Sequence, residues 1–169
     1  MPWWGWMIIG ALLLGSELLG VEALDPLARN GRLVPFLEEH GLLDELGGWL
    51  GQAMSIRGQK LVCYHKNWIY FANRFGLEIA GYAEPKPGIP PTPRHVETII
   101  ELIRDRGIEV ILSANYFNPA KPQAIADRTG ARVVTVPLYS TGESGIADYE
   151  RLMDAWIGRL VEAFRETEG

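Results

Sequence analysis

The sequence predicts an α/β fold in which a four-stranded, mainly parallel sheet is flanked by helices, preceded by an apolar N-terminal helix. Three observations lead to this prediction. Short buried strand patterns alternate with amphipathic helix patterns from Lys60 onward, and such alternation is typical of parallel sheets joined by crossover helices. The length of 169 residues suits one ordinary domain with an extension. The first 23 residues differ in composition from all that follow.

The apolar stretch at 1–23 contains Trp3, Trp4 and Trp6 and then a run interrupted by glycines, Ser16 and Glu17. Its length approaches that of a membrane-spanning helix, and tryptophans are typical of the membrane interface. It lacks the positive region of a secretory signal, although residues 21–23 resemble a weak cleavage site. A membrane anchor, an uncleaved signal and a helix packed on the domain therefore remain alternatives.

Residues 24–56 have the apolar spacing of helices, broken by Gly41 and by the pair Gly47 and Gly48, and we expect two short helices in this linker region. The α/β lobe is expected at 57–169. Its expected strands are 61–64, 77–82, 109–113 and 132–137, and its expected helices are 68–75, 93–106, 119–129 and 146–166. Thr92 and Pro93 form a typical helix start, and Gly76, Gly107 and Gly130 stand where helices end.

Composition excludes several classes of function. The chain has 16 basic and 21 acidic residues and a formal charge of −5, without a basic run that would indicate nucleic-acid binding. Cys63 is the single cysteine, which excludes an internal disulfide, and its strand-like surroundings predict a buried thiol. Residues 142–145 read GESG and not G-x-S-x-G, and no phosphate-binding loop occurs. We therefore expect no catalysis and no catalytic residues.

The candidate site follows from the strand positions. Ligands bind outside the carboxyl ends of parallel strands, so the residues just after each expected strand are the candidates. They are His65, Lys66 and Asn67 after the first strand, Glu84 and Lys86 after the second, Asn115 and Tyr116 after the third, and Tyr139, Ser140, Thr141 and Glu143 after the fourth.

An imidazole and a carboxylate on one edge suit a borderline divalent ion such as zinc. His65 is read either as a metal ligand or as a histidine that caps a strand end through hydrogen bonds. For Glu84 the alternative to metal binding is a pairing with Lys86 or with a helix N-terminus. His95 lies inside an expected helix and is predicted to be a surface or packing residue away from the strand ends.

The segment YHKNWIYFANRFGLEIAGYAEPKPGIPPTPRHV resembles the metal-binding substrate-binding proteins of zinc and manganese ABC importers, in particular their carboxy-terminal lobe. The resemblance extends from about Leu24 to Phe164 and includes ILSANYF, VVTVPLY and the closing helix. It implies that His65 is a metal ligand. The first 23 residues resemble instead the first membrane segment of NfeD-like proteins.

In that family a carboxylate in the loop after the last strand is usually a further ligand, often in a stretch like LYSD. Here the stretch reads LYST, with Thr141 in place of the carboxylate, so Glu143, two residues further along, becomes the candidate substitute. Asn67, Glu84, Asn115 and Tyr139 are expected around the site.

The resemblance also implies an amino-terminal lobe that supplies two more histidines, one in a stretch like HxWLDP, and no such stretch occurs in this sequence. We therefore expect a fragment, a rearranged gene product or half of an assembly. The expected ion is Zn²⁺, or alternatively Mn²⁺, incompletely coordinated by this chain alone.

The resemblance implies metal transport on the periplasmic or extracytoplasmic side, with an ABC-importer permease as partner and with a homodimer or a separate amino-terminal lobe to complete the site. Membrane association is expected through residues 1–23. The alternative is a membrane-anchored interaction module that has lost metal binding.

Overall fold

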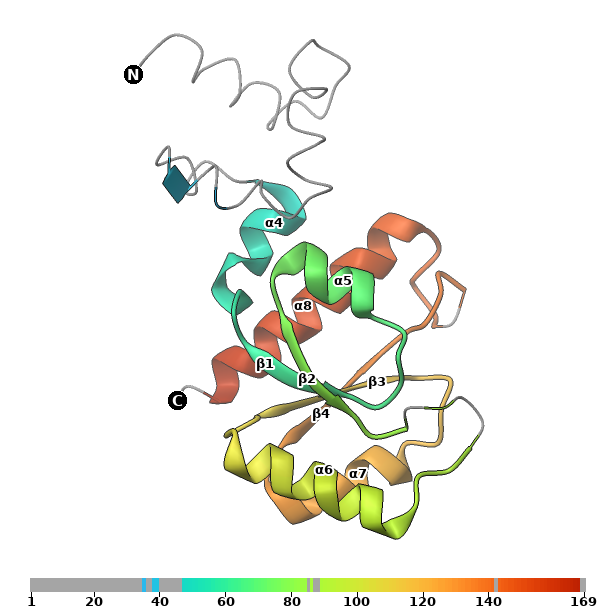
Figure 1. Ribbon diagram of the computed structural model, residues 1–169. Coiled ribbons are helices and arrows are strands. Elements are labelled where there is room, and N and C mark those ends of the chain that lie inside the picture. The colour runs from blue at the N-terminus through green and yellow to red at the C-terminus, as the bar shows by residue number, and fades with distance from the viewer. Residues whose placement is uncertain are drawn as a thin grey trace, which may run out of the picture. The chain divides into compact units, whose positions relative to one another are not determined.

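The computed structural model describes residues 35, 38–39, 47–84, 86, 89–141 and 143–167 (Figure 1). The chain divides into two compact units, Met1–Met54 and Ser55–Gly169. In the first unit, helix α4 (Gly48–Ala53) begins directly after Gly47, at the second of the two glycines. The 3₁₀ helix η2 (Met54–Ile56) follows it.

The predicted apolar segment at 1–23 and most of the predicted linker helices lie outside the described residues. Within the described ranges, no helix has both the length and the apolar character needed to cross a bilayer. The membrane segment and the domain boundaries drawn from the sequence therefore stay predictions.

The second unit is built on a four-stranded sheet in the order β2-β1-β3-β4. Its strands are β1 (Lys60–Cys63), β2 (Glu78–Tyr82), β3 (Val110–Ala114) and β4 (Arg132–Val136). Every neighbouring pair is parallel. The predicted α/β class is confirmed, and each strand lies within a residue of its predicted position at either end.

Helices cover both faces of this sheet (Figure 1). They are α5 (Ile69–Phe75), α6 (Pro93–Asp105), α7 (Ala120–Thr129) and α8 (Tyr149–Thr167). Helices α6 and α7 lie side by side on one face, and α5 and α8 lie on the other. Thr92 caps α6 as predicted, because its hydroxyl accepts a hydrogen bond from the backbone N–H of His95 at 3.2 Å.

Both faces of the sheet are buried because helices cover each of them. Successive side chains of the central strands point to opposite sides, so each strand contributes to both apolar layers. One buried cluster joins Val62, Tyr64 and Ile111 to isoleucines of α6 and α7. The alternate residues of β1 and β3, including Cys63, are buried as well. Burial raises the pKa of the Cys63 thiol to about 12, so it is an unreactive core residue, as predicted.

Helix α6 approaches the edge strand β2 closely at Gly81. A methyl group at this position would lie 2.8 Å from Cδ2 of Leu102 and 3.3 Å from Cδ1 of Ile99. The register between β1 and β2 also shifts here, since Leu61 pairs with Ile79 and Val62 pairs with Gly81. A residue without a side chain thus allows α6 to pack against an irregular strand.

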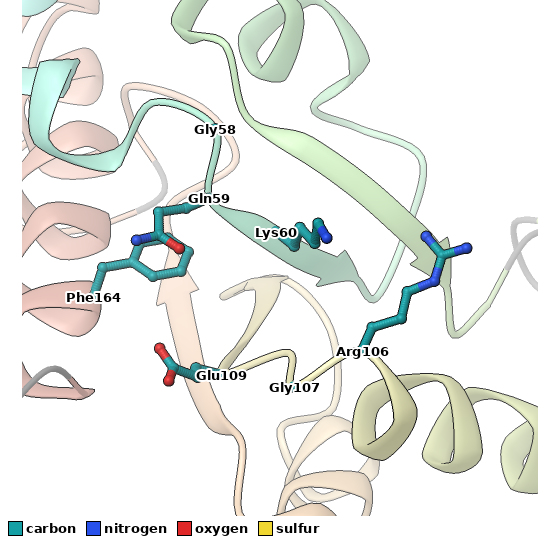
Figure 2. Close-up of a pocket in the computed structure, with 7 residues that line it drawn as sticks. All are labelled: Gly58, Gln59, Lys60, Arg106, Gly107, Glu109 and Phe164. Carbon is teal, nitrogen blue, oxygen red and sulfur yellow. The ribbon is translucent and has the colours of Figure 1, made fainter.

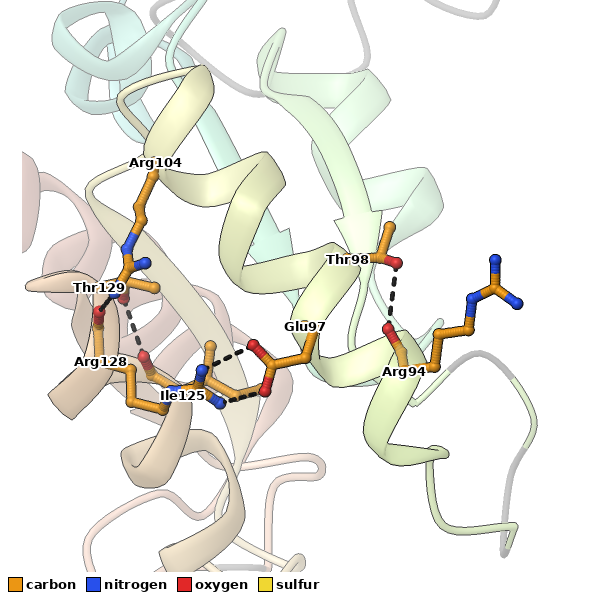
Figure 3. Close-up of polar contacts among 7 residues, drawn as sticks. All are labelled: Arg94, Glu97, Thr98, Arg104, Ile125, Arg128 and Thr129. Atoms are coloured by element: carbon orange, nitrogen blue, oxygen red, sulfur yellow. Dashed lines mark hydrogen bonds and ion pairs between the residues drawn. The ribbon is translucent and has the colours of Figure 1, made fainter.

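Polar contacts join α6 to α7 on the outside of the sheet (Figure 3). The guanidinium of Arg128 donates two hydrogen bonds to the carboxylate of Glu97, at 2.7 and 2.6 Å. This hydrogen bonding lowers the pKa of Glu97. Arg104 donates to the backbone carbonyl of Arg128. The two helices are therefore cross-linked at their exposed surfaces as well as through their apolar sides.

The last helix starts later than the sequence predicts. Ile146 is buried but belongs to a turn in which its N–H donates to the carbonyl of Glu143 at 3.2 Å. Asp148 then accepts a hydrogen bond from the backbone N–H of Arg151 at 2.8 Å. An aspartate that accepts from a residue three positions later is a typical helix start, so the helix begins at Tyr149 and not at Ile146.

Candidate metal centre

The strand order β2-β1-β3-β4 places a change in the direction of the connections at the carboxyl ends of β1 and β3. The chain leaves β1 toward α5 on one face of the sheet, and it leaves β3 toward α7 on the other face (Figure 1). The connections that leave these two neighbouring strands therefore diverge, so no crossover covers the space between the two strand ends. A ligand site is therefore expected where His65 follows β1.

His65 lies at this position with its imidazole buried. The residue is 3% exposed, and neither ring nitrogen has a hydrogen-bond partner among the described residues. Burial lowers the pKa of His65, while the carboxylate of Glu84 opposes that shift and Lys121 adds to it. The imidazole is therefore neutral at physiological pH, which is the form that donates a nitrogen lone pair to a metal ion.

Glu84 is the acidic neighbour of this imidazole. Its backbone N–H donates to the carbonyl of Tyr64 at 2.8 Å, which extends the pairing of β2 with β1 by two residues. The residue is 6% exposed, and Oε1 of its carboxylate lies 3.9 Å from Nδ1 of His65. This distance is too long for a hydrogen bond. The imidazole nitrogen and the carboxylate oxygen therefore face one another as two separate groups that could each bind a metal ion.

Lys121 provides a cation at the same carboxylate. Its Nζ lies 4.0 Å from Oε2 of Glu84, and its side chain is about half exposed. The lysine comes from the first turn of α7, which begins after β3. It balances part of the charge that Glu84 carries into the interior.

An aromatic ring covers the imidazole. The ring centroids of His65 and Phe117 are 3.5 Å apart with an interplanar angle of 35°. Tyr64 contacts the same imidazole edge-on at 4.9 Å. The lysine and the phenylalanine were not among the predicted site residues, although both follow β3 closely. The strand-end rule points to the first residues after each strand, whereas Phe117 lies further along the loop and Lys121 lies in the first turn of α7.

The remaining predicted residues are less closely associated with His65. The side chains of Asn67, Asn115 and Tyr139 are exposed. Glu143 is held by α8, because Arg159 donates two hydrogen bonds to its carboxylate at 3.1 and 2.5 Å. This hydrogen bonding lowers the pKa of Glu143. The same guanidinium donates to the carbonyl of Thr135 in β4 at 2.8 Å, so the loop carboxylate is tied to the sheet.

The prediction that His95 lies away from the strand ends is wrong. Its Nε2 lies 2.9 Å from the backbone carbonyl of Tyr82, the last residue of β2. The close packing of α6 on β2 at Gly81 brings the first turn of the helix to the end of the strand. His95 is therefore a packing residue at the same edge as Glu84, and its contact is with the backbone.

The described part of the chain holds no group of three or more histidine, cysteine, aspartate or glutamate side chains placed to bind one metal ion. The pair His65 and Glu84 supplies one nitrogen donor and one carboxylate. A structural zinc site usually has four ligands. Two buried donors are thus a partial coordination shell.

A cavity of about 340 Å³ lies at the opposite edge of the sheet (Figure 2). Its lining residues are Gly58, Gln59, Lys60, Arg106, Gly107, Glu109 and Phe164. Lys60 is the first residue of β1, and Glu109 directly precedes β3, so the cavity faces the amino ends of these strands. None of the predicted site residues lines it. Because parallel sheets bind ligands at the carboxyl ends of their strands, it is the weaker candidate.

Comparison with known proteins identifies the family of this fold and site. The family model of zinc-uptake complex component A, periplasmic (ZnuA) matches residues 40–163. The chain belongs to this family. The resemblance to metal-binding substrate-binding proteins that the sequence indicated is thereby confirmed.

The relatives of this ZnuA-family chain are longer proteins. The high-affinity zinc uptake system protein ZnuA of Brucella abortus is 27% identical over 99 residues, which cover 58% of this chain and 30% of that protein. The laminin-binding protein Lbp of Streptococcus pyogenes has 25% identity and a TM-score of 0.56, covering 85% of this chain and 57% of that one. The chain thus spans under a third of the curated relatives it matches.

The substrate-binding protein FpvC of Pseudomonas aeruginosa, solved in complex with Mn²⁺, shares the fold. The two chains have a TM-score of 0.58 at 22% identity, and the match covers 83% of this chain and 57% of FpvC. For the ZnuA-family chain this likeness establishes the architecture of the sheet and its flanking helices. It establishes no individual ligand.

Proposed function

We propose that this chain binds a divalent transition-metal ion, zinc or alternatively manganese, as the carboxy-terminal lobe of an ABC-importer substrate-binding protein. In this proposal the ion is the transported cargo and the chain catalyses no reaction. The observation that carries it is the imidazole of His65, which is buried at the β1 and β3 strand ends without a hydrogen-bond partner in the described ranges.

The alternative reading of His65 as a hydrogen-bonded strand cap has no support from the geometry. Buried polar side chains are nearly always hydrogen-bonded. Leaving one unsatisfied costs about 1–3 kcal/mol. An ion bound to a ring nitrogen would offset that cost, and the adjacent carboxylate of Glu84 would share the positive charge. Nitrogen and carboxylate donors together suit zinc better than they suit calcium or magnesium.

The proposal is tested by calorimetric titration of the metal-free protein with Zn²⁺ and, separately, with Mn²⁺. We expect His65→Ala to remove a ligand and weaken zinc binding at least tenfold, which corresponds to about 1.4 kcal/mol. His95→Ala is the matched control, since this histidine lies at the same edge but contacts the backbone of Tyr82. Equal zinc affinities for wild type and His65→Ala would show that His65 is not a metal ligand.

The proposal includes Glu143 as a further ligand. To bind an ion, its carboxylate would have to leave Arg159, which holds it with two hydrogen bonds. Arg159→Gln would release the carboxylate and therefore strengthen zinc binding if Glu143 is a ligand. If the substitution leaves zinc affinity unchanged while Glu143→Gln also has no effect, Glu143 is a structural residue.

The partners of this chain are proposals of the same kind: an importer permease, a separate amino-terminal lobe, or a second copy of the chain, on the extracytoplasmic side. In the described region, several exposed large apolar side chains come after strand ends in the sequence, and such side chains can contribute to a contact with a partner. They are Ile69, Tyr70, Ile89, Tyr116, Tyr139 and Tyr149. Light scattering with and without Zn²⁺ tests the second copy. A zinc-dependent dimer that His65→Ala abolishes would support it, and a monomer under both conditions would exclude it.

The exposed apolar side chains also fit a second candidate, a membrane-anchored interaction module that has lost metal binding. Under this alternative, His65→Ala would not change zinc affinity, whereas substitution of the exposed aromatic residues would weaken the binding of a partner.

A further inference from the structure

Phe117 occupies a turn whose position is fixed on both sides. Asn115, just after β3, donates its backbone N–H to the carbonyl of Val136 at the end of β4, at 2.9 Å. The side chain of Asn118 accepts a hydrogen bond from the N–H of Ala120 at 2.9 Å, where α7 begins. The backbone N–H of Phe117 itself closes the turn by donating to Ala114 at 3.2 Å. The turn thus presents this side chain from a defined backbone.

The ring of Phe117 is directed at His65. The two ring centroids are 3.5 Å apart, closer than the separation of Phe117 from Tyr116, which is 5.4 Å. Both nitrogens of the imidazole are fully shielded from solvent. Phe117 itself is partly exposed, and Tyr116 is 69% exposed. The ring therefore lies on the imidazole and borders the solvent at the same time.

We propose that Phe117 is a positioning residue that covers His65, holds the plane of its imidazole, and controls access of ligands to the ring nitrogens. Its importance for metal exchange rests on the proposed function of His65. Its role as a cover does not, because the stacked rings and the buried nitrogens are features of the protein without an ion.

Phe117 is expected to affect the rates at which an ion enters and leaves the site as well as the affinity for that ion. An ion that binds a ring nitrogen needs a path to an atom that has no solvent-accessible surface. The partly exposed Phe117 is the group that can move aside, and its departure breaks an aromatic pair. Such a pair stabilises the covered arrangement beyond the apolar area that it buries. Removing the ring should therefore raise both the rate of ion entry and the rate of ion release. The affinity, which is set by the ratio of these rates, should change less.

The first test needs no metal. Carbethoxylation of histidine by diethyl pyrocarbonate is followed in the metal-free full chain by mass spectrometry of peptides that separate His40, His65 and His95. We expect slow modification of His65 in wild type and modification about two- to tenfold faster in Phe117→Ala, the range implied by the loss of an aromatic pair. Phe117→Tyr should restore the slow rate, and Tyr116→Ala should leave it unchanged.

The second test measures zinc release into excess chelator by stopped flow for the same variants. Faster release from Phe117→Ala, with rescue by Phe117→Tyr, supports the cover at the metal site. Circular dichroism establishes that each variant is folded. Equal modification rates of His65 in folded wild type and Phe117→Ala would overturn the cover. If His65→Ala leaves zinc affinity unchanged while the modification rates differ as expected, the metal function fails and the cover stands.

Discussion

The imidazole of His65 lies 3.9 Å from a carboxylate, packs against an aromatic ring and is almost completely buried. Burial favours the neutral imidazole, while the carboxylate of Glu84 opposes this shift in pKa. A neutral ring nitrogen can donate its lone pair to a divalent cation, and the adjacent carboxylate adds an electrostatic attraction for the positive charge. Lys121 acts against this attraction, because it brings a positive charge to the same carboxylate.

The first prediction follows from that charge. Lys121→Met should strengthen zinc binding about 1.4- to fivefold, since removing a half-exposed charge is worth about 0.2–1 kcal/mol. The sign is opposite to the loss expected for His65→Ala. Lys60→Met is the control, because Lys60 stands at the amino end of β1 on the opposite edge. Calorimetry of the three proteins compares the affinities, and weaker binding by Lys121→Met would contradict the role given to this lysine.

The second prediction concerns the dependence of stability on pH. The pKa of His65 is lowered from 6.5 in the fold, so the unfolded chain binds the proton more readily. The stability that the neutral imidazole contributes is fully present above about pH 6.5 and is lost as the pH falls toward the lower folded value. The variant His65→Gln has no imidazole to protonate, so its stability lacks this dependence on pH.

Urea unfolding in the presence of a chelator, at several values between about pH 8 and pH 5, measures this effect. The free energy of unfolding of wild type should fall more steeply with decreasing pH than that of His65→Gln. A difference between the two proteins that stays constant across the range would show that His65 does not titrate differently in the fold.

Among the secondary-structure elements, α6 determines how the carboxyl edge is assembled. It packs closely on β2 at Gly81. Its first turn brings His95 to the end of the strand, and its outer surface is bound to α7 through Glu97 and Arg128. Helix α7 in turn carries Lys121. The position of Lys121 beside Glu84 therefore depends on two helices that are packed together on one face of the sheet.

The third prediction compares two glycines. Gly81→Val should destabilise the protein by about 1–3 kcal/mol, the usual cost of overpacking, because added methyl groups would meet Leu102 and Ile99. In α8, Gly158 has open space around its Cα, and Gly158→Ala should stabilise by about 0.5–1 kcal/mol because alanine favours the helix. Thermal and urea unfolding measure the two changes. Equal signs would contradict the close approach of α6 to β2.

For the Ser55–Gly169 unit as a whole, stability comes from two apolar layers, one on each face of the sheet. Ile100 of α6 is 1% exposed on one face, and Ile157 of α8 is fully buried on the other (Figure 1). The layers are separated by the sheet and share its strands. The unit should therefore unfold as one cooperative structure.

The fourth prediction tests this cooperativity. Ile100→Ala and Ile157→Ala should each cost about 2–5 kcal/mol, as is usual for truncating a buried isoleucine. Because the sites lie on opposite faces, the double variant should lose the sum of the two values within about 0.5 kcal/mol. Urea unfolding followed by circular dichroism and by tryptophan fluorescence should show one shared transition. Two separate transitions would mean that the layers are independent.

The sequence by itself determined the class of the fold and the position of His65. Strand and helix periods alternate clearly, glycines stand at the helix ends, and the strand-end rule depends only on the order of elements. These are local properties of the chain, so they are readable from nearby residues. The same rule selected Glu84, and the structure places it beside His65.

Only the tertiary structure decided which of the strand-end residues meet. Phe117 and Lys121 reach the site because the strand order places β1 next to β3. Glu143 is instead bound by Arg159 of α8, which lies 16 residues further along the chain. His95 reaches the edge because Gly81 lets α6 approach β2. Such pairings depend on strand order and on helix packing between distant segments, and the residues near each side chain in the sequence do not specify them.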